Sequence, residues 1–247
     1  MNQNLEAKIF SDNKSKYRFA GVTALIAVIA NITDVVLGFG DSEVAAYGTK
    51  TAVEWFAIFQ QSGFKGLYVL GILNIVYQTC LIPVYFALYE IHKRNSEFYP
   101  ALAFILFLVG LVIYFSNSAA VPMFVLSGKY TAAGTDAQRI IIAAAGEAVL
   151  ARGEDFTPGS FISLIFGGIA AIIISIVMLR GGIFSKVVSW IGIIGFSLLS
   201  IFIILSTFLP KLYFLAFYGF GMLGGLFVLA WFLLVAKKFF QLGKIQN

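Results

Sequence analysis

The feature that most limits the fold of this chain is a series of long apolar runs. They cover residues 18–40, 66–90, 99–126, 159–179, 187–209 and 212–236. A helix rises 1.5 Å per residue, so about 20 residues cross about 30 Å of hydrocarbon. Because a backbone in lipid must satisfy its own polar groups, each run predicts a transmembrane helix. The expected fold class is an all-α polytopic bundle of about six transmembrane helices, forming one integral membrane domain over residues 1–247.

The composition supports a membrane solvent and excludes several function classes. Charged residues make up 12% of the 247 residues, whereas a soluble domain carries about a quarter. The net charge of +5 does not indicate nucleic-acid binding, because Lys and Arg lie at the ends of the apolar runs. With one cysteine, Cys80, and one histidine, His92, the chain offers neither an internal disulfide nor a multi-histidine metal site. The sequence predicts membrane lipids as partners and no metal or cofactor.

The distribution of Lys and Arg predicts the orientation. The side that carries both termini receives 11 of the 17 Lys and Arg residues, and the opposite side receives the other 6. The 11 are Lys8, Lys14, Lys16, Arg18, Lys93, Arg94, Arg180, Lys186, Lys237, Lys238 and Lys244. Cytoplasmic loops carry the excess of positive charge. We therefore expect a multi-pass protein of the cytoplasmic membrane with both termini in the cytoplasm.

Two loops on the opposite, external side carry helix-start signals. Thr51 with Glu54 and Thr135 with Gln138 both match the capping box, in which a hydroxyl and a carboxylate or amide satisfy free N–H groups. The first box precedes an apolar stripe, which consists of Ala52, Trp55, Phe56 and Phe59. This pattern predicts a short interfacial helix lying on the outer membrane surface. The second helix, over 140–150, is expected either to lie on the membrane or to cover the mouth of the bundle as a lid.

Polar side chains inside the runs are the candidate ligand-binding residues, because polar groups in hydrocarbon are costly. Asp34 lies roughly 9 Å from the outer end of the first run, counted at the helical rise. The predicted depths of Asn74 and Asn117 are roughly 12 and 13 Å in the second and third runs. The five candidates are Asn31, Asp34, Asn74, Gln78 and Asn117. Together they predict a polar pocket in the outer half of the membrane.

A purely structural role for these side chains stays open. Amides and hydroxyls join transmembrane helices by hydrogen bonds of about 0.6–2 kcal/mol each. An Asp in such a setting is either protonated or paired with amide donors. No catalytic residue is predicted: the sequence contains no P-loop, dinucleotide-binding turn, HExxH or GxSxG, and no histidine at the depth of Asp34. An enzyme is therefore not favoured, although it is not excluded.

Two further features have competing interpretations. Gly221 and Gly225 form a GxxxG in the last run, which allows close helix crossing either within the bundle or in a homo-oligomer. His92 belongs to a charged cluster with Glu90, Lys93 and Arg94 at the inner end of the second run. An interfacial anchor is the favoured role of this cluster over a catalytic role for His92.

Three stretches carry a resemblance to a known family. They are GEAVLARG (146–153), SIVMLRGGIFSKVVSWIGIIGFSLL (175–199) and LAWFLLVAKKFFQLG (229–243). The chain resembles a family of bacterial and archaeal membrane proteins called domain of unknown function four-three-eight-six. The resemblance implies a single domain of roughly six helices in a prokaryotic cytoplasmic membrane. It implies no activity.

The leading functional hypothesis is binding or transport of a small molecule, an ion or a lipid through an outward-facing polar pocket. The alternative is a structural or accessory membrane subunit without catalytic or transport activity of its own.

Overall fold

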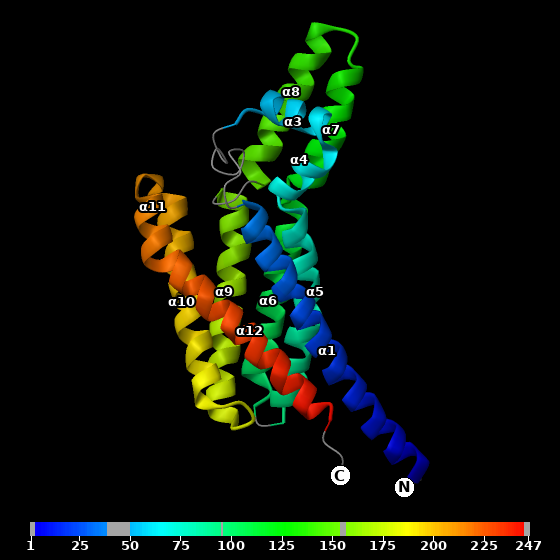
Figure 1. The fold of residues 1–247 in the computed structure, drawn as a ribbon, viewed down its shortest axis with the longest axis vertical. Coiled ribbons are helices and arrows are strands. Elements are labelled where there is room, and N and C mark those ends of the chain that lie inside the picture. Colours follow the sequence, from blue (N-terminus) through cyan, green and yellow to red (C-terminus); the bar gives the residue numbers. More distant parts are fainter. Residues whose placement is uncertain (1–2, 39–49, 95, 154–156, 245–247) are drawn as a thin grey trace.

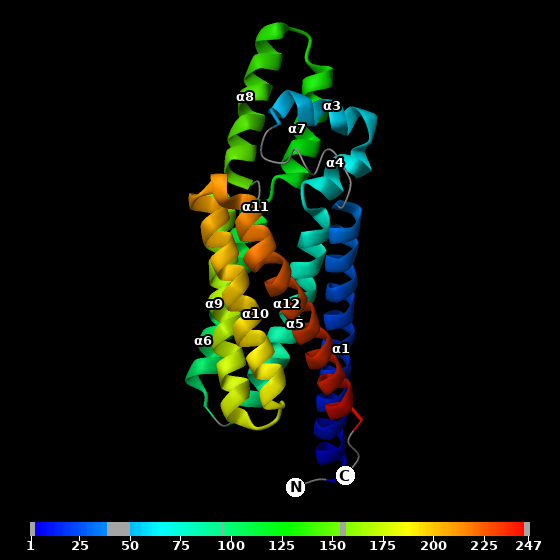
Figure 2. The same ribbon diagram turned by 60° about the vertical axis from the view of Figure 1, so that its left-hand side comes forward.

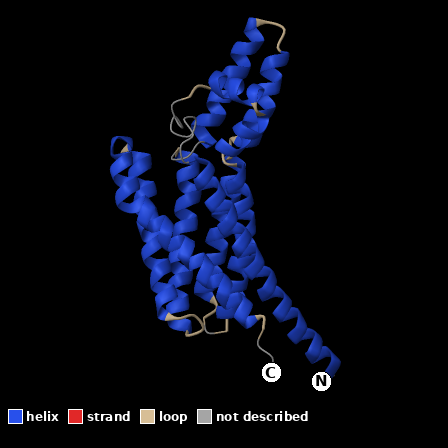
Figure 3. Ribbon diagram, viewed as in Figure 1, coloured by secondary structure: helices blue, strands red, loops and turns tan. Residues whose placement is uncertain are grey.

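A computed structural model describes residues 3–38, 50–94, 96–153 and 157–244, and no strand occurs in these ranges (Figure 3). The described residues contain six helical segments long and apolar enough to cross a membrane, which confirms the predicted all-α polytopic bundle. The helices of the bundle are α1 (Gln3–Gly38), α5 (Ile72–His92), α6 (Phe98–Asn117), α9 (Pro158–Gly181), α10 (Lys186–Phe208) and α12 (Met222–Leu242). Before α12 come a 3₁₀ turn (Pro210–Leu212), α11 (Tyr213–Ala216) and a π-helical turn (Phe217–Gly221). The chain is therefore an integral membrane protein.

The six bundle helices form a closed ring. In the order α1, α5, α6, α9, α10 and α12, each helix packs against the next, and α12 returns to α1. At this last contact the Arg18 Nε donates a hydrogen bond to the Gly243 carbonyl at 3.2 Å. Both termini lie at one end of the bundle, here called the terminal end (Figures 1 and 2). The opposite end is called the head end.

Large buried side chains fill the ring toward the terminal end. Leu88, Met178, Trp231 and Phe239 are almost completely buried there. Within a membrane, burying such side chains between helices gains packing contacts rather than hydrophobic free energy, because lipid tails are as apolar as the core. Close packing is therefore what holds this half of the ring together.

Glycines set the crossing of α10 and α12. A Cβ atom on Gly195 would lie 2.7 Å from the Phe227 Cβ, and one on Gly224 would lie 2.9 Å from the Leu199 backbone nitrogen. Of the predicted GxxxG, Gly221 faces Phe202 of α10, whereas a Cβ on Gly225 would meet nothing within 4 Å. The glycines thus serve internal packing, and the homo-oligomer through Gly221 and Gly225 stays a prediction.

Four helices form a separate layer beyond the head end, which we call the head (Figures 1 and 2). They are α3 (Ala52–Gln61), α4 (Gly63–Val69), α7 (Ala120–Ala132) and α8 (Asp136–Gly153). The predicted run over 99–126 is divided between α6 and α7, because α6 ends at Asn117. In a continuous helix the ring of Pro122 would clash with the carbonyl of Ser118. In the first turn of α7, Pro122 needs no hydrogen-bonded N–H and is tolerated.

The structure corrects the predicted environment of both external helices. The apolar stripe of α3 exists, but Trp55 and Phe56 are buried against α7 and α8, so the stripe faces protein rather than lipid. The α8 helix pairs with α7 in a hairpin that points away from the bundle (Figure 1). It neither lies flat beside the bundle nor covers its mouth. Of the α8 side, only Gly146 and Leu150 are buried in this arrangement.

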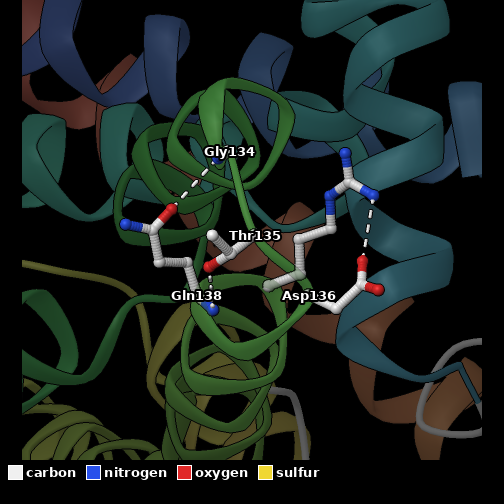
Figure 4. Close-up of polar contacts among 5 residues, drawn as sticks. Gly134, Thr135, Asp136 and Gln138 are labelled. Atoms are coloured by element: carbon white, nitrogen blue, oxygen red, sulfur yellow. Dashed lines mark hydrogen bonds and ion pairs between the residues drawn. The ribbon is translucent and has the colours of Figure 1, made fainter.

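Both capping-box motifs begin helices, and the reciprocal bonds of the box are both formed at α3 only. At α3 the Thr51 hydroxyl accepts a hydrogen bond from the Glu54 N–H, and the Glu54 carboxylate accepts one from the Thr51 N–H at 2.7 Å. At α8 the Thr135 hydroxyl accepts from the Gln138 N–H at 3.2 Å (Figure 4). The Gln138 amide oxygen accepts from the Gly134 N–H at 3.0 Å. These bonds satisfy N–H groups that helix starts leave free.

Candidate functional site

A cavity of about 350 Å³ lies inside the head-end half of the ring. All six bundle helices line it, and one lining residue from each, in ring order, is Asn31, Asn74, Tyr114, Ser163, Ser200 and Gly225. Tyr85 and Phe107, stacked with ring centroids 4.1 Å apart, form part of its floor. Below them lies the close-packed half of the ring. We call this space the central cavity.

Three of the five predicted candidates line the central cavity: Asn31, Asn74 and Gln78. Asn74 and Gln78 lie one turn apart on α5, so they present two amides on one face of the helix. Among the described residues, the side chains of Asn31 and Gln78 have no hydrogen-bond partner, unlike Asn74. Amides that lack protein partners are free to bind water or a ligand.

Asp34 lies behind this polar wall. Its Oδ2 accepts a hydrogen bond from the Asn74 Nδ2 at 3.3 Å, while Asp34 itself is not among the residues that line the cavity. The contact joins α1 to α5 and fixes one hydrogen of the Asn74 amide. Asp34 therefore acts on the cavity through Asn74.

Asn117 lies apart from the other candidates, at the base of the head. Its Oδ1 accepts a short hydrogen bond from the Arg152 Nε, and its Nδ2 donates to the Gly159 carbonyl at 3.2 Å. It thus joins the end of α6 to α8 and α9. The predicted depth of Asn117 assumed a helix that continues to residue 126, and α6 ends at Asn117 itself.

Sequence reasoning missed the aromatic and small residues of the cavity. Tyr77 and Tyr114 line it beside the amides, and Gly167, Gly168 and Gly225 make room for it. The side of Gly168 faces the hydroxyl of Ser200, since a Cβ there would lie 2.6 Å from the Ser200 Oγ. Consecutive glycines in the middle of a transmembrane run are the signal that indicates close approach or open space at this level.

The lining of the central cavity carries no formal charge. No Asp, Glu, Lys, Arg or His lies among its residues in the described chain. Ser163 and Ser200 donate their hydroxyl hydrogens to carbonyls of their own helices, at 2.7 and 2.8 Å. The described residues also contain no group of three or more His, Cys, Asp or Glu side chains able to hold a metal ion. The arrangement offers hydrogen bonds and aromatic surface, and it does not offer a nucleophile with a base.

Comparison of the chain with protein-family models, with curated proteins and with solved structures found no match.

Proposed function

We propose that the protein binds a small uncharged molecule in the central cavity and transports it across the membrane. The observation that supports this proposal is a cavity of about 350 Å³ in the middle of a closed ring, with amides on its wall. Ligand sites in proteins have volumes of about 300–1,000 Å³, and few polar groups on a mainly apolar wall fix the ligand. The Lys and Arg distribution supports an opening toward the exterior at the head end.

Of the ligand classes predicted from the sequence, the residues that line the central cavity favour an uncharged small molecule over an ion. An ion would lose its hydration without meeting an opposite charge, and such a loss is costly in a cavity of low dielectric constant. The amides of Asn74 and Gln78 instead donate and accept hydrogen bonds, and the rings of Tyr77 and Phe196 offer flat apolar surface. A neutral molecule with hydrogen-bonding groups on an aromatic or aliphatic body fits both features.

Filling the cavity tests the proposal. Gly225→Trp places a large side chain in the cavity, and the Cβ position is unobstructed. Gly219→Trp is the matched control, because its Cβ is equally unobstructed and Gly219 does not line the cavity. The probe is a panel of small neutral compounds, and the readout is the rise in Tm of the protein in lipid nanodiscs. We expect compounds that stabilise the unmodified protein and Gly219→Trp, but not Gly225→Trp. Equal stabilisation of both variants would contradict binding in this cavity.

The accessory-subunit alternative is favoured by one feature of the head. Ile140 and Ile141, near the start of α8, are 69% and 70% exposed, and the α7–α8 hairpin extends away from the bundle (Figure 1). An accessory subunit would use such a surface for a partner protein. Under this alternative Ile140→Ser with Ile141→Ser would abolish co-purification of that partner, and Gly225→Trp would have no effect on it.

A further inference from the structure

A second cavity, of about 380 Å³, lies at the terminal end between α5, α6 and α9. It shares no lining residue with the central cavity. Its wall on α9 is apolar and includes Ile173 and Ile176. Around it lie polar side chains, namely His92, Ser96, Tyr99 and Arg180. We call this space the interfacial cavity, because it lies where the predicted spans end.

His92 is the unusual member of this cavity. The residue is completely buried, and neither of its ring nitrogens has a hydrogen-bond partner. Its ring packs 5.8 Å from that of Phe184, which contributes no polar contact. An imidazole always carries at least one N–H donor, and a buried donor without a partner destabilises the protein. A molecule bound in the cavity would supply the missing partner.

Arg180 supplies a positive charge at the edge of the same cavity. It lies in the last turn of α9 and is exposed, and no carboxylate among the described residues forms an ion pair with it. The Glu90 carboxylate of α5 does not line this cavity and is paired with the Lys93 ammonium. A guanidinium presents a fork of donors that matches the oxygens of a phosphate group.

The apolar wall extends from Arg180 into the hydrocarbon. Ile176 lies one helical turn from Arg180 and is 37% exposed, so this side of the cavity faces lipid. Tyr99, which is 51% exposed at the start of α6, lies at the interface, where tyrosine is enriched in membrane proteins. The positive charge is thus at headgroup level and the apolar surface is at acyl-chain level.

We propose that the interfacial cavity binds an anionic phospholipid of the leaflet at the terminal end. Arg180 binds the lipid phosphate, and the hydroxyls of Ser96 and Tyr99 donate hydrogen bonds beside it. One acyl chain lies along Ile173 and Ile176. The buried His92 ring lies beside the polar glycerol ester region, where the chain and the phosphate join, and a rotation of the ring on binding brings a nitrogen to it. Basic pockets between transmembrane helices recognise lipid headgroups by the same chemistry.

Lipid binding by charge variants tests the role of Arg180. The probe is phosphatidylglycerol, counted by native mass spectrometry on the delipidated full chain. Arg180→Gln removes the charge and keeps much of the side chain, and we expect about tenfold weaker binding. Lys186→Gln is the matched control, because it removes one exposed charge at the same end outside the cavity. Equal binding by the two variants would overturn the proposal.

Two competitors distinguish binding of the intact phospholipid from binding of its phosphate or its acyl chains alone. Inorganic phosphate at millimolar concentration is expected to leave phosphatidylglycerol bound, because it cannot use the apolar wall. Displacement by inorganic phosphate alone would instead assign a free-anion site and overturn the phospholipid proposal. Diacylglycerol, which has chains and no phosphate, is expected to bind equally to the unmodified protein and to Arg180→Gln.

The variant His92→Phe tests the buried imidazole. Phenylalanine keeps a ring in the packed position and removes both nitrogens. We expect weaker binding of phosphatidylglycerol, while the Tm of the delipidated variant equals or exceeds that of the unmodified protein, since an unsatisfied donor is gone. Unchanged lipid binding would overturn the role of His92.

Discussion

Asn74 is the residue that connects the Asp34 carboxylate to the central cavity. It lines the cavity and donates a hydrogen bond to Asp34 at 3.3 Å. We expect Asn74→Leu to lower the free energy of unfolding by about 1–2 kcal/mol, because the Asp34 carboxyl loses its donor. Unfolding in mixed micelles measures this loss. The double variant with Asp34→Leu should recover part of it, since an apolar pair leaves nothing unsatisfied. Purely additive losses would contradict a direct interaction.

One added methyl group is expected to affect the free energy of unfolding differently at two glycines of neighbouring helices. Gly195→Ala places a Cβ 2.7 Å from the Phe227 Cβ, so α10 and α12 must separate. We expect a loss of about 1–3 kcal/mol in the free energy of unfolding, the usual cost of overpacking. Gly225→Ala is the control, because its Cβ meets nothing within 4 Å. A similar loss in both variants would show that helix propensity rather than crossing distance decides the effect.

At the scale of elements, the two capped helices of the head respond differently to pH. The Thr51 backbone N–H and hydroxyl donate to the Glu54 carboxylate and hold the pKa of Glu54 below its ordinary value of 4.5. A lowered pKa in the folded state stabilises α3 above pH 4.5 and ceases to do so as the pH falls through the folded-state pKa. The matching bonds of α8 come from the uncharged Gln138 (Figure 4).

Hydrogen exchange across acidic pH measures this difference. After correction for intrinsic rates, we expect the protection of the first turn of α3 to fall below about pH 4.5, while that of α8 stays constant in an Asp136→Asn background, which removes the Asp136–Arg139 pair of its first turn. Glu54→Gln together with Glu147→Gln should make α3 behave like α8, because Glu147 also accepts a hydrogen bond from the Ala52 N–H, at 2.7 Å, and an amide accepts the same bonds without titrating. Loss of protection in both helices at one pH would indicate unfolding of the whole head instead.

The break between α6 and α7 shows why part of the candidate site was predictable. Helix length and polarity place Asn31 and Gln78 on the cavity because each lies inside an uninterrupted helix, where depth follows from counting. Asn74 also lines the cavity, but its predicted depth was wrong, because the run over 66–90 is divided at Gly71 between α4 (Gly63–Val69) and α5, and Asn74 lies in the first turn of α5. Asn117 lies where the helix ends, and a count along the sequence does not reveal that end. The sequence also did not reveal what covers the apolar stripe of α3, since an apolar face has the same pattern whether lipid or protein covers it.

At the scale of the whole molecule, the position of the head relative to the membrane follows from charge. We expect both termini in the cytoplasm and the head outside. In a Cys80→Ser background, Ala137→Cys at the tip of the head should react with a membrane-impermeant maleimide in intact cells. Lys238→Cys at the terminal end should react only after permeabilisation. The reverse pattern would contradict the predicted orientation.

The ring is closed by its first and last helices, and this has a consequence for how the protein is made. Arg18 of α1 bonds to Gly243, and a Cβ on Gly21 would lie 3.1 Å from the Phe240 ring, so the seam joins residues that are far apart in the order of synthesis. A ribosome that adds residues in order leaves α1 without its final neighbour until α12 is complete. Until α12 is in place, lipid, α5 or the insertion machinery must cover the polar side chain of Asn31. The central cavity therefore forms only after α12 has been synthesised and has packed against α1.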